Sequence, residues 1–417
     1  MDRIGMGRYQ WTVLLLSGLG WAADNMWIQA IAIILPHIQR YFVLTDGIVG
    51  LASSSIFVGM FVGSIAWGVV SDSYGRRAAF NVTLAVTAVF GTLAAMAGSF
   101  ALLCVLLFAV GTGVGGSMPT DSSNLVENLP VRKHSYVTAL SVFFSAGSVV
   151  SSLIGLAVLS ASDPDGWRWL LGALAGVTVV FVSARVAFFR LLESPKYLPS
   201  ASDLVSRYSE LFSPSWKRTT LLIWVIWGGM SYGFTTFNVL LPKLLESRYD
   251  SPAAMQGEPD DASIRRAMLD ILLYSLSSLP GSLISAYMVE TRLGRIGTMV
   301  SSTAIMAAAV LVFSLTYWRS SLTVVSVSSS ISYAAIYGYT PEVMAPTIRA
   351  TACGTASAIS RVAGIIAPLL AGWAFSLSPA VPLFMATSVL VIVTSAMALL
   401  PIETRGRATD GNGVASH

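Results

Sequence analysis

The chain has 417 residues, of which 54% are hydrophobic and only 11% carry a formal charge. A water-soluble globule of this size could not bury so much apolar surface, so the composition excludes a soluble domain and predicts a protein whose solvent is lipid. The net charge of +4 does not indicate a nucleic-acid partner. In a membrane protein such a charge mainly reflects the loops on the cytoplasmic side.

Twelve apolar stretches of spanning length follow one another along the chain. The first six lie at about 12–35, 48–70, 78–98, 100–123, 135–160 and 168–190, and the second six at about 219–241, 268–289, 297–318, 320–341, 352–376 and 381–400. We therefore expect an all-α membrane protein with two six-helix bundles. The bundles are expected over 1–192 and 218–403, with a short cytoplasmic linker over 193–217 and a cytoplasmic tail over 404–417.

The basic residues predict that both termini lie in the cytoplasm. In that orientation 16 of the 25 Lys and Arg residues fall on the inner side, seven fall outside, and two, Arg185 and Arg361, lie within spans. This distribution follows the positive-inside rule. The first apolar stretch is longer than a signal h-region and has no small-residue cleavage site, so it is predicted to be the first span. The sequence does not distinguish the plasma membrane from an internal one.

The two sets of spans carry matching charged markers after their second, fourth and sixth spans. The pairs are Gly75 with Gly294, Glu127 with Glu342, and Glu193 with Glu403, at offsets of 219, 215 and 210 residues. Three markers at nearly one period indicate an internal duplication. Parallel repeats of six spans are the plan of major facilitator proteins, in which the substrate binds between the repeats near the midplane.

The loop after the second span matches the facilitator signature Gly-x-x-x-Asp-x-x-Gly-Arg-Arg at every fixed position, from Gly68 through Asp72 and Gly75 to Arg76 and Arg77. Glycine allows a tight turn there, and the aspartate can meet the positive end of a neighbouring helix. We predict a cytoplasmic gate that also includes ion pairs of Glu127 with Arg132 and of Glu342 with Arg349. Its members are Asp72, Gly75, Arg76, Arg77, Glu127, Arg132, Glu290, Arg292, Arg295, Glu342 and Arg349. The alternative is that these charges only set the topology or are solvated.

Further short motifs extend this resemblance over essentially the whole chain. They are Gly7-Arg-Tyr-Gln-Trp11, Ala23-Asp24-Asn25, Gly111-Thr-Gly-Val-Gly-Gly116, Gly166-Trp-Arg-Trp169, Glu193-Ser-Pro-Lys196, Tyr339-Thr-Pro-Glu342 and Arg361-Val-Ala-Gly-Ile-Ile-Ala-Pro368. Together they resemble the fungal relatives of the synaptic-vesicle two-related transporters, with elements shared with sugar porters. The resemblance implies the major facilitator fold, alternating access and a small-molecule cargo, commonly an organic ion or metabolite. Relatives carry an arginine where this chain has Leu107, and in facilitators that arginine is linked to proton movement, so coupling to protons stays open.

Ionisable residues within spans are functional candidates, because a charge at the bilayer centre costs at least about 2.5 kcal/mol. Asp24 lies 12 residues into the first span, about 18 Å from its start and so near the midplane. It can bind a cation or carry a proton; the alternative is a structural ion pair, most simply with Arg361. Arg361 itself can bind a carboxylate through its guanidinium. Asp121, near the cytoplasmic end of the fourth span, is predicted to titrate as well or to be a solvated helix end.

Polar stripes mark the faces that line a central cavity in this fold. The seventh span has Gly228, Ser231, Thr235 and Asn238 at helical spacing, the tenth has Ser326, Ser329, Tyr333 and Tyr337, and the fifth has Ser141, Ser145, Ser148 and Ser152. We select Asn238, Tyr333 and Tyr337 as orienting groups, because amides and phenols play this role in otherwise apolar pockets. Ordinary helix packing is the alternative for each of them.

The sequence holds no His-Glu-x-x-His, Gly-x-Ser-x-Gly or Walker motif, so we expect neither an enzyme nor a site for a metal or cofactor. The main hypothesis is secondary transport of a small organic solute, with a site formed by Asp24, Asp121, Asn238, Tyr333, Tyr337 and Arg361. Protons are the expected coupling ion if there is one. The alternatives are a proton-independent uniporter of a sugar-like solute and a non-transporting receptor or scaffold. One bundle of twelve spans suffices for transport, so a monomer is sufficient.

Overall fold

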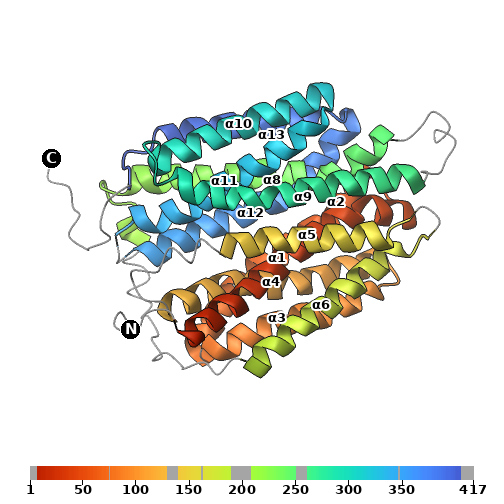
Figure 1. Ribbon diagram of the computed structural model, residues 1–417, viewed down its shortest axis with the longest axis horizontal. Coiled ribbons are helices and arrows are strands. Elements are labelled where there is room, and N and C mark those ends of the chain that lie inside the picture. The colour runs from red at the N-terminus through yellow and green to blue at the C-terminus, as the bar shows by residue number, and fades with distance from the viewer. Residues whose placement is uncertain are drawn as a thin grey trace.

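The structure is a computed structural model that describes residues 7–74, 76–128, 140–160, 163–188, 208–249, 261–345 and 348–404 (Figure 1). Twelve long helices occupy these ranges. The first six are α1 (Arg8–Tyr41), α2 (Asp46–Tyr74), α3 (Arg76–Ala95), α4 (Phe100–Asn128), α5 (Leu140–Val158) and α6 (Gly166–Phe188). The second six are α8 (Lys217–Tyr249), α9 (Asp261–Met288), α10 (Gly294–Thr316), α11 (Arg319–Val343), α12 (Arg349–Leu377) and α13 (Val381–Ala398). The predicted linker lies mostly outside the described residues, and the tail after Thr404 lies wholly outside them.

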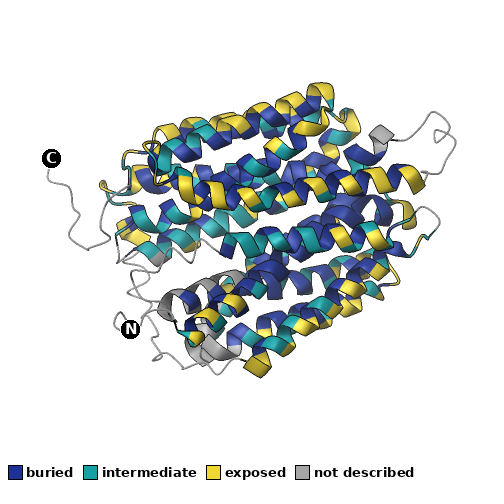
Figure 2. Cartoon of the chain, viewed as in Figure 1, coloured by how far each residue is buried: buried dark blue, intermediate teal, exposed yellow. Residues whose placement is uncertain are grey.

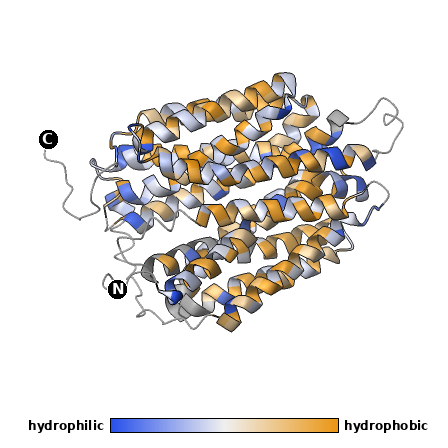
Figure 3. Cartoon of the chain, in the orientation of Figure 1, coloured by the Kyte–Doolittle hydropathy of each residue, from blue (hydrophilic) through white to orange (hydrophobic). Residues whose placement is uncertain are grey.

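The helices have the length and surface of a membrane bundle. Within the described ranges, nine of them are long and apolar enough to cross a bilayer. The other three are α3, whose apolar part is Ala79–Ala95, and α8 and α11. Both α8 and α11 turn polar side chains towards the interior. Hydrophobic residues cover the middle of the helices and hydrophilic residues gather at the two ends (Figure 3), while exposed residues lie on the outer faces (Figure 2).

Helices α1–α6 pack against one another, and so do α8–α13. The two halves meet mainly where α2 packs on α12, α5 on α9 and α1 on α8. If the second half repeats the first, α9 corresponds to α2 and α12 to α5. Each half then contributes the same two helices to the interface, as a two-fold relation requires. This arrangement agrees with the predicted duplication.

We call the end of the bundle at which α1 begins the near end, and the end at which α1 finishes the far end. The loop after α9 lies at the near end, and its backbone favours the glycine of the repeated motif. Gly294 has φ of +66°, a conformation that side chains rarely adopt. A Cβ added there would lie 2.8 Å from the carboxylate of Glu403. Glu403 accepts hydrogen bonds from the backbone N–H groups of Arg295 (2.9 Å) and Ile296 (3.0 Å), and so caps the start of α10.

Candidate functional site

A cavity of about 140 Å³ lies between the two halves. Its walls come from α1, α2 and α5 of the first half and from α8, α9, α11 and α12 of the second. Four of the six predicted site residues line it: Asn238, Tyr333, Tyr337 and Arg361. The predicted polar stripes of α5, α8 and α11 also face this space, except for Ser152 of α5 and Gly228 of α8. The structure thus brings these side chains together, while their role in substrate binding stays a prediction.

Aromatic rings form a continuous arc along the cavity and across the boundary between the halves. Tyr337 of α11 lies 5.9 Å from Trp21 of α1 and 4.8 Å from Trp227 of α8, measured between ring centroids. Further along, Tyr333 packs edge-on against Phe234 at 5.4 Å. Edge-to-face contacts of this kind fix ring orientation. The arc therefore gives the cavity a rigid apolar wall suited to a flat apolar body.

Of the described residues that line the cavity, Arg361 is the one with a formal charge. Its guanidinium Nη1 lies 3.5 Å from the sulfur of Met60 on α2, so the side chain reaches from the second half to the first. The preceding residue, Ser360, uses its backbone carbonyl to accept a hydrogen bond of 2.7 Å from Ser231. This contact joins α12 to α8 beside the arginine. The site can therefore offer a planar cation at the boundary between the halves.

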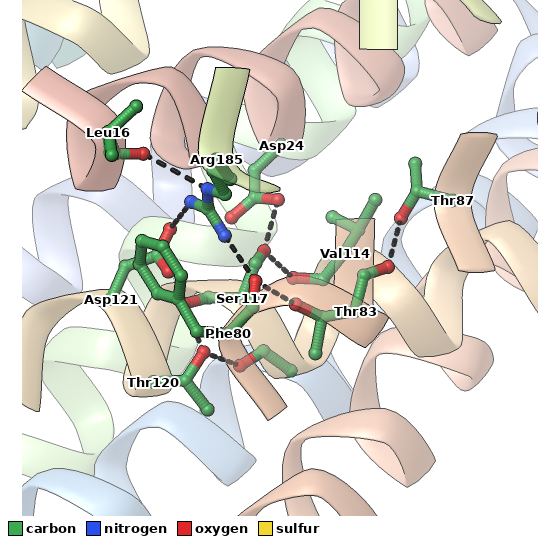
Figure 4. A network of polar contacts seen from close by, with 11 residues as sticks. Leu16, Asp24, Phe80, Thr83, Thr87, Val114, Ser117, Thr120, Asp121 and Arg185 are labelled. Carbon is green, nitrogen blue, oxygen red and sulfur yellow. Dashed lines mark hydrogen bonds and ion pairs between the residues drawn. The ribbon is translucent and has the colours of Figure 1, made fainter. Parts of the chain in front are cut away.

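Asp24 does not line the cavity, although Asn25 does. Successive residues point about 100° apart around a helix, so one faces the cavity while the other faces α4. Asp24 is completely buried, and its Oδ1 is hydrogen-bonded to Ser117 (Figure 4). The sequence-based alternative of an ion pair between Asp24 and Arg361 is thus replaced by a contact within the first half. As a proton site, Asp24 stays a prediction.

Asp121 lies in the same buried region and pairs with Arg185 of α6 (Figure 4). Both side chains are 0% exposed, and Nη2 of Arg185 lies 2.5 Å from Oδ2 of Asp121. Arg185 also donates to the carbonyls of Leu16 (3.1 Å) and Phe80 (2.6 Å), and its guanidinium lies 3.7 Å from the centre of the Phe80 ring. The expectation of a solvated helix end at Asp121 is therefore wrong, because this carboxylate is enclosed by α1, α3, α4 and α6.

The predicted gate is partly described. Asp72, Gly75, Arg76, Arg77, Glu127 and Arg132 fall where the side chains, or the residues themselves, are outside the described part. In the second half, Arg295 binds Glu342 through two hydrogen bonds of 2.8 and 2.5 Å. Glu342 also accepts from Thr404 at 3.0 Å. The predicted partner of Glu342 was Arg349, and the observed partner is Arg295. Glu290 and Arg292 are exposed at the turn between α9 and α10.

Two ion pairs join the halves at the far end, and the sequence analysis did not anticipate them. Arg40 of α1 lies 2.6 Å from Glu246 of α8, and Lys243 of α8 pairs with Asp46 of α2. Lys243 also donates to Gln39 at 3.0 Å. The far end is further held by Ser54, which donates to the carbonyl of Ile365 at 2.9 Å. These contacts close the cavity on that side.

Towards the near end the described parts of the two halves separate. Residues 141–144 of α5 and 357–361 of α12 are all partly exposed, and Tyr337 is 38% exposed. A helix in close contact with a partner would show buried residues at every turn. The faces of α5 and α12 that point inward thus meet open space at the near end. Among the described residues, the cavity is closed at the far end and accessible from the near end.

Twelve helices in two equivalent halves around a central cavity are the plan of a membrane transport protein. The family model described as Major Facilitator Superfamily matches residues 11–327, and the chain belongs to this family. It is 30% identical to "MFS siderochrome iron transporter 1" of Ceriporiopsis subvermispora, over 98% of this chain and 90% of that protein. It is 29% identical to the rat "Synaptic vesicle 2-related protein", over 98% of this chain and 81% of that one. These relatives place the chain in the synaptic-vesicle two-related branch that its motifs indicated.

Solved structures confirm the fold. A "D-xylose-proton symporter" superposes with a TM-score of 0.74 over 96% of this chain and 100% of the other, at 16% sequence identity. The relatives and the fold are those of transporters and not of enzymes. The chain is therefore a multi-pass integral membrane protein that moves small solutes.

Proposed function

We propose that this chain transports small organic carboxylates and that Arg361 binds the carboxylate. The observation that carries the proposal is the charge of the cavity: of the described residues that line it, Arg361 alone has a formal charge. A guanidinium can hold a carboxylate through two parallel hydrogen bonds. Asp24 and Asp121 are turned away from the cavity, so they would not repel a bound anion directly.

The aromatic arc supports a cargo with a flat, apolar body. Trp21, Tyr337 and Trp227 present ring faces and edges along one wall of the cavity. Pockets for small molecules are typically apolar with a few polar groups that fix orientation. A carboxylate on an aromatic or other cyclic body would satisfy both Arg361 and this wall.

The closed far end and the accessible near end of the described residues support alternating access. We assign the near end to the cytoplasm, as the distribution of basic residues predicts, so this state faces inward. The Arg40–Glu246 and Lys243–Asp46 pairs would then form the outer gate. The Lys243–Asp46 pair is partly exposed on both sides and contributes only about 0–1 kcal/mol, which suits a gate that must open and close, while Glu246 of the other pair is buried.

A count of hydrogens supports a proton at Asp24. The hydroxyl oxygen of Ser117 contacts both Asp24 Oδ1 and, at 2.8 Å, the carbonyl of Val114. A hydroxyl has one hydrogen, while a carbonyl and an ionised carboxylate only accept. Both contacts are hydrogen bonds when Asp24 carries a proton and donates it to Ser117. We therefore include coupling of the carboxylate to a proton at Asp24 in the proposal.

The test compares four compounds that separate charge from shape: benzoate, benzamide, benzylamine and D-xylose. The purified protein is unfolded thermally with each compound, since a ligand at 100 times its dissociation constant stabilises the folded state by about 2.7 kcal/mol. We expect benzoate to stabilise the protein and the neutral and cationic analogues to have little effect. Arg361→Gln should abolish the benzoate effect. Arg266→Gln, which removes an exposed arginine of α9, serves as the matched control and should retain it.

Uptake of labelled benzoate into proteoliposomes then separates transport from binding alone. Binding without uptake would favour the receptor or scaffold alternative. Stabilisation by D-xylose alone, unchanged in Arg361→Gln, would favour the sugar uniporter, for which the many serines of the cavity wall offer hydroxyl partners. The first outcome would remove transport from the proposal, and the second would remove the carboxylate.

A further inference from the structure

Four polar atoms in the far-end half of the cavity have no hydrogen-bond partner. They are Nε2 of Gln29, Oγ of Ser53, Oδ1 of Asn238 and Oη of Tyr274, and all four side chains line the cavity. The residues are 2%, 1%, 2% and 4% exposed, so bulk solvent does not satisfy them. Buried polar atoms in native proteins are almost always hydrogen-bonded, and an exception requires an explanation such as an absent ligand or water.

The rest of the polar wall differs, because several of its hydroxyls already have partners within the protein. Ser231 donates to the carbonyl of Ser360 at 2.7 Å, Ser326 to that of Tyr274 at 2.5 Å, and Ser278 to that of Ser275 at 2.7 Å. These hydroxyls have used their one hydrogen. One further polar atom of the described lining, Nε1 of Trp21, also has no partner, but Trp21 packs against Tyr337 and precedes Gln29 on α1 by eight residues, or about 12 Å along the helix. The four unpartnered atoms of the far-end half thus form a distinct group, which we call the far subsite.

Two helices from different halves give the same distance between the far subsite and the arginine. On α2, Ser53 precedes Met60, the residue in contact with Arg361, by seven residues, or about 10 Å along the helix. On α8, Asn238 follows Ser231, which is bonded to Ser360, by seven residues, again about 10 Å. Tyr274 is at the same level, because its ring lies 6.0 Å from that of Phe237.

We propose that the far subsite binds an uncharged hydrogen-bonding group of the same cargo, so that the substrate is a carboxylate with a hydroxyl or carboxamide at its other end. This inference rests on the proposed function of Arg361. Gln29 supplies a donor, Asn238 an acceptor, and Ser53 and Tyr274 can act as either. A hydroxyl both donates and accepts, and so it fits this mixed set. A charged group would lie buried without a counter-charge among the described lining residues, at a high cost.

The length of the cargo follows from the same geometry. The two levels are about 10 Å apart, and a hydrogen bond of about 2.9 Å is needed at each end. Roughly 5 Å remain between the carboxylate and the neutral group. This is close to the span of a single ring substituted at opposite positions, as in 4-hydroxybenzoate. Such a ring would also lie along the aromatic arc.

The test measures dissociation constants of benzoate and 4-hydroxybenzoate, which differ by one hydroxyl and carry the same carboxylate. We expect 4-hydroxybenzoate to bind about tenfold more tightly. In Gln29→Leu and in Asn238→Leu the ratio should fall towards one, and a thermal unfolding transition like that of the parent shows that each variant is folded. Ser278→Ala removes a cavity hydroxyl that is already bonded to its own helix, and it should keep the tenfold ratio.

Three results would overturn the inference in different ways. Equal affinities in the parent protein would mean that a buried water satisfies the far subsite. A tenfold ratio that survives in both leucine variants would place the hydroxyl elsewhere in the cavity. In both cases benzoate binding that depends on Arg361 would leave the proposed function intact. If neither compound binds, the proposed function fails, and the far subsite fails with it.

Discussion

Replacing Arg185 by glutamine removes a cation from a site in which every neighbour is buried. Arg185 and Asp121 are both 0% exposed, and the guanidinium also satisfies the carbonyls of Leu16 and Phe80. The substitution leaves the Asp121 carboxylate without its counter-charge and removes donors from two buried carbonyls. Breaking a buried ion pair by removing one partner typically costs about 3–5 kcal/mol. We expect a loss of stability of this size in Arg185→Gln.

The reasoning predicts a different result when both charges are removed. Arg185→Met combined with Asp121→Leu leaves no unpaired charge, and replacing a buried pair by apolar side chains is often neutral or stabilising by about 1–4 kcal/mol. The double variant should therefore be more stable than Arg185→Gln alone. Gly20→Ala gives an independent check, because its Cβ would lie 1.9 Å from Oδ2 of Asp121 and 2.0 Å from Nη2 of Arg185. Alanine there must displace the pair.

The assay is equilibrium unfolding of the purified variants in mixed micelles, followed by tryptophan fluorescence. Arg168→Gln is the matched control, since Arg168 pairs with Asp165 at 2.8 Å, with side chains that are 22% and 50% exposed. A partly exposed pair of this kind contributes about 0–1 kcal/mol. The reasoning is refuted if Arg185→Gln loses no more stability than Arg168→Gln, or if the double variant is less stable than each single one.

Three other changes test the coupling, the outer gate and the cap of α10. Asp24→Asn can still donate to Ser117 and should keep benzoate exchange but lose accumulation driven by a pH gradient; accumulation that persists in proteoliposomes would exclude Asp24 as the proton site. Lys243→Glu places two like charges at the far end, so a reagent added on that side should label a cysteine in the cavity more strongly. Adding Asp46→Lys should restore the closed state and lower the labelling again. Equal labelling in the single and the double variant would rule out a gating role. Glu403→Gln weakens a charged cap worth about 0.3–1 kcal/mol and should speed hydrogen exchange at the start of α10, with no change at α13.

The spans could be predicted from hydropathy, but their far ends could not. The first span was expected to end near residue 35, yet α1 continues to Tyr41, and α8 continues past the expected residue 241 to Tyr249. The extra turns hold Arg40 on α1 and Lys243 and Glu246 on α8. These residues are polar, so a hydropathy pattern ends before them. They stay helical because they pair with one another across the two halves or with Asp46.

The candidate site was predictable where a helix has one polar stripe. Asn238, Tyr333 and Tyr337 were selected by helical spacing, and all three line the cavity. Asp24 was selected with them but does not line the cavity, because α1 is buried on all sides and its sequence gives the depth of a residue without its direction. The sequence analysis identified Arg185 as an arginine within a predicted span. Its pairing with Asp121 depends on how α6 packs beside α4, which a local pattern does not contain.

The position of the charges in the two halves has a consequence for transport under the proposed function. The first half holds Asp24 and the Asp121–Arg185 pair, while Arg361 belongs to the second half. A bound carboxylate brings one negative charge to Arg361, and a proton on Asp24 brings one positive charge. The loaded and empty proteins then carry the same net charge, so reorientation with cargo moves no net cargo charge across the bilayer. A buried charge is the main cost of moving the site across the bilayer. Because bound carboxylate and proton add no net charge, this cost does not rise when cargo binds, and weak ion pairs at the far end suffice as a gate.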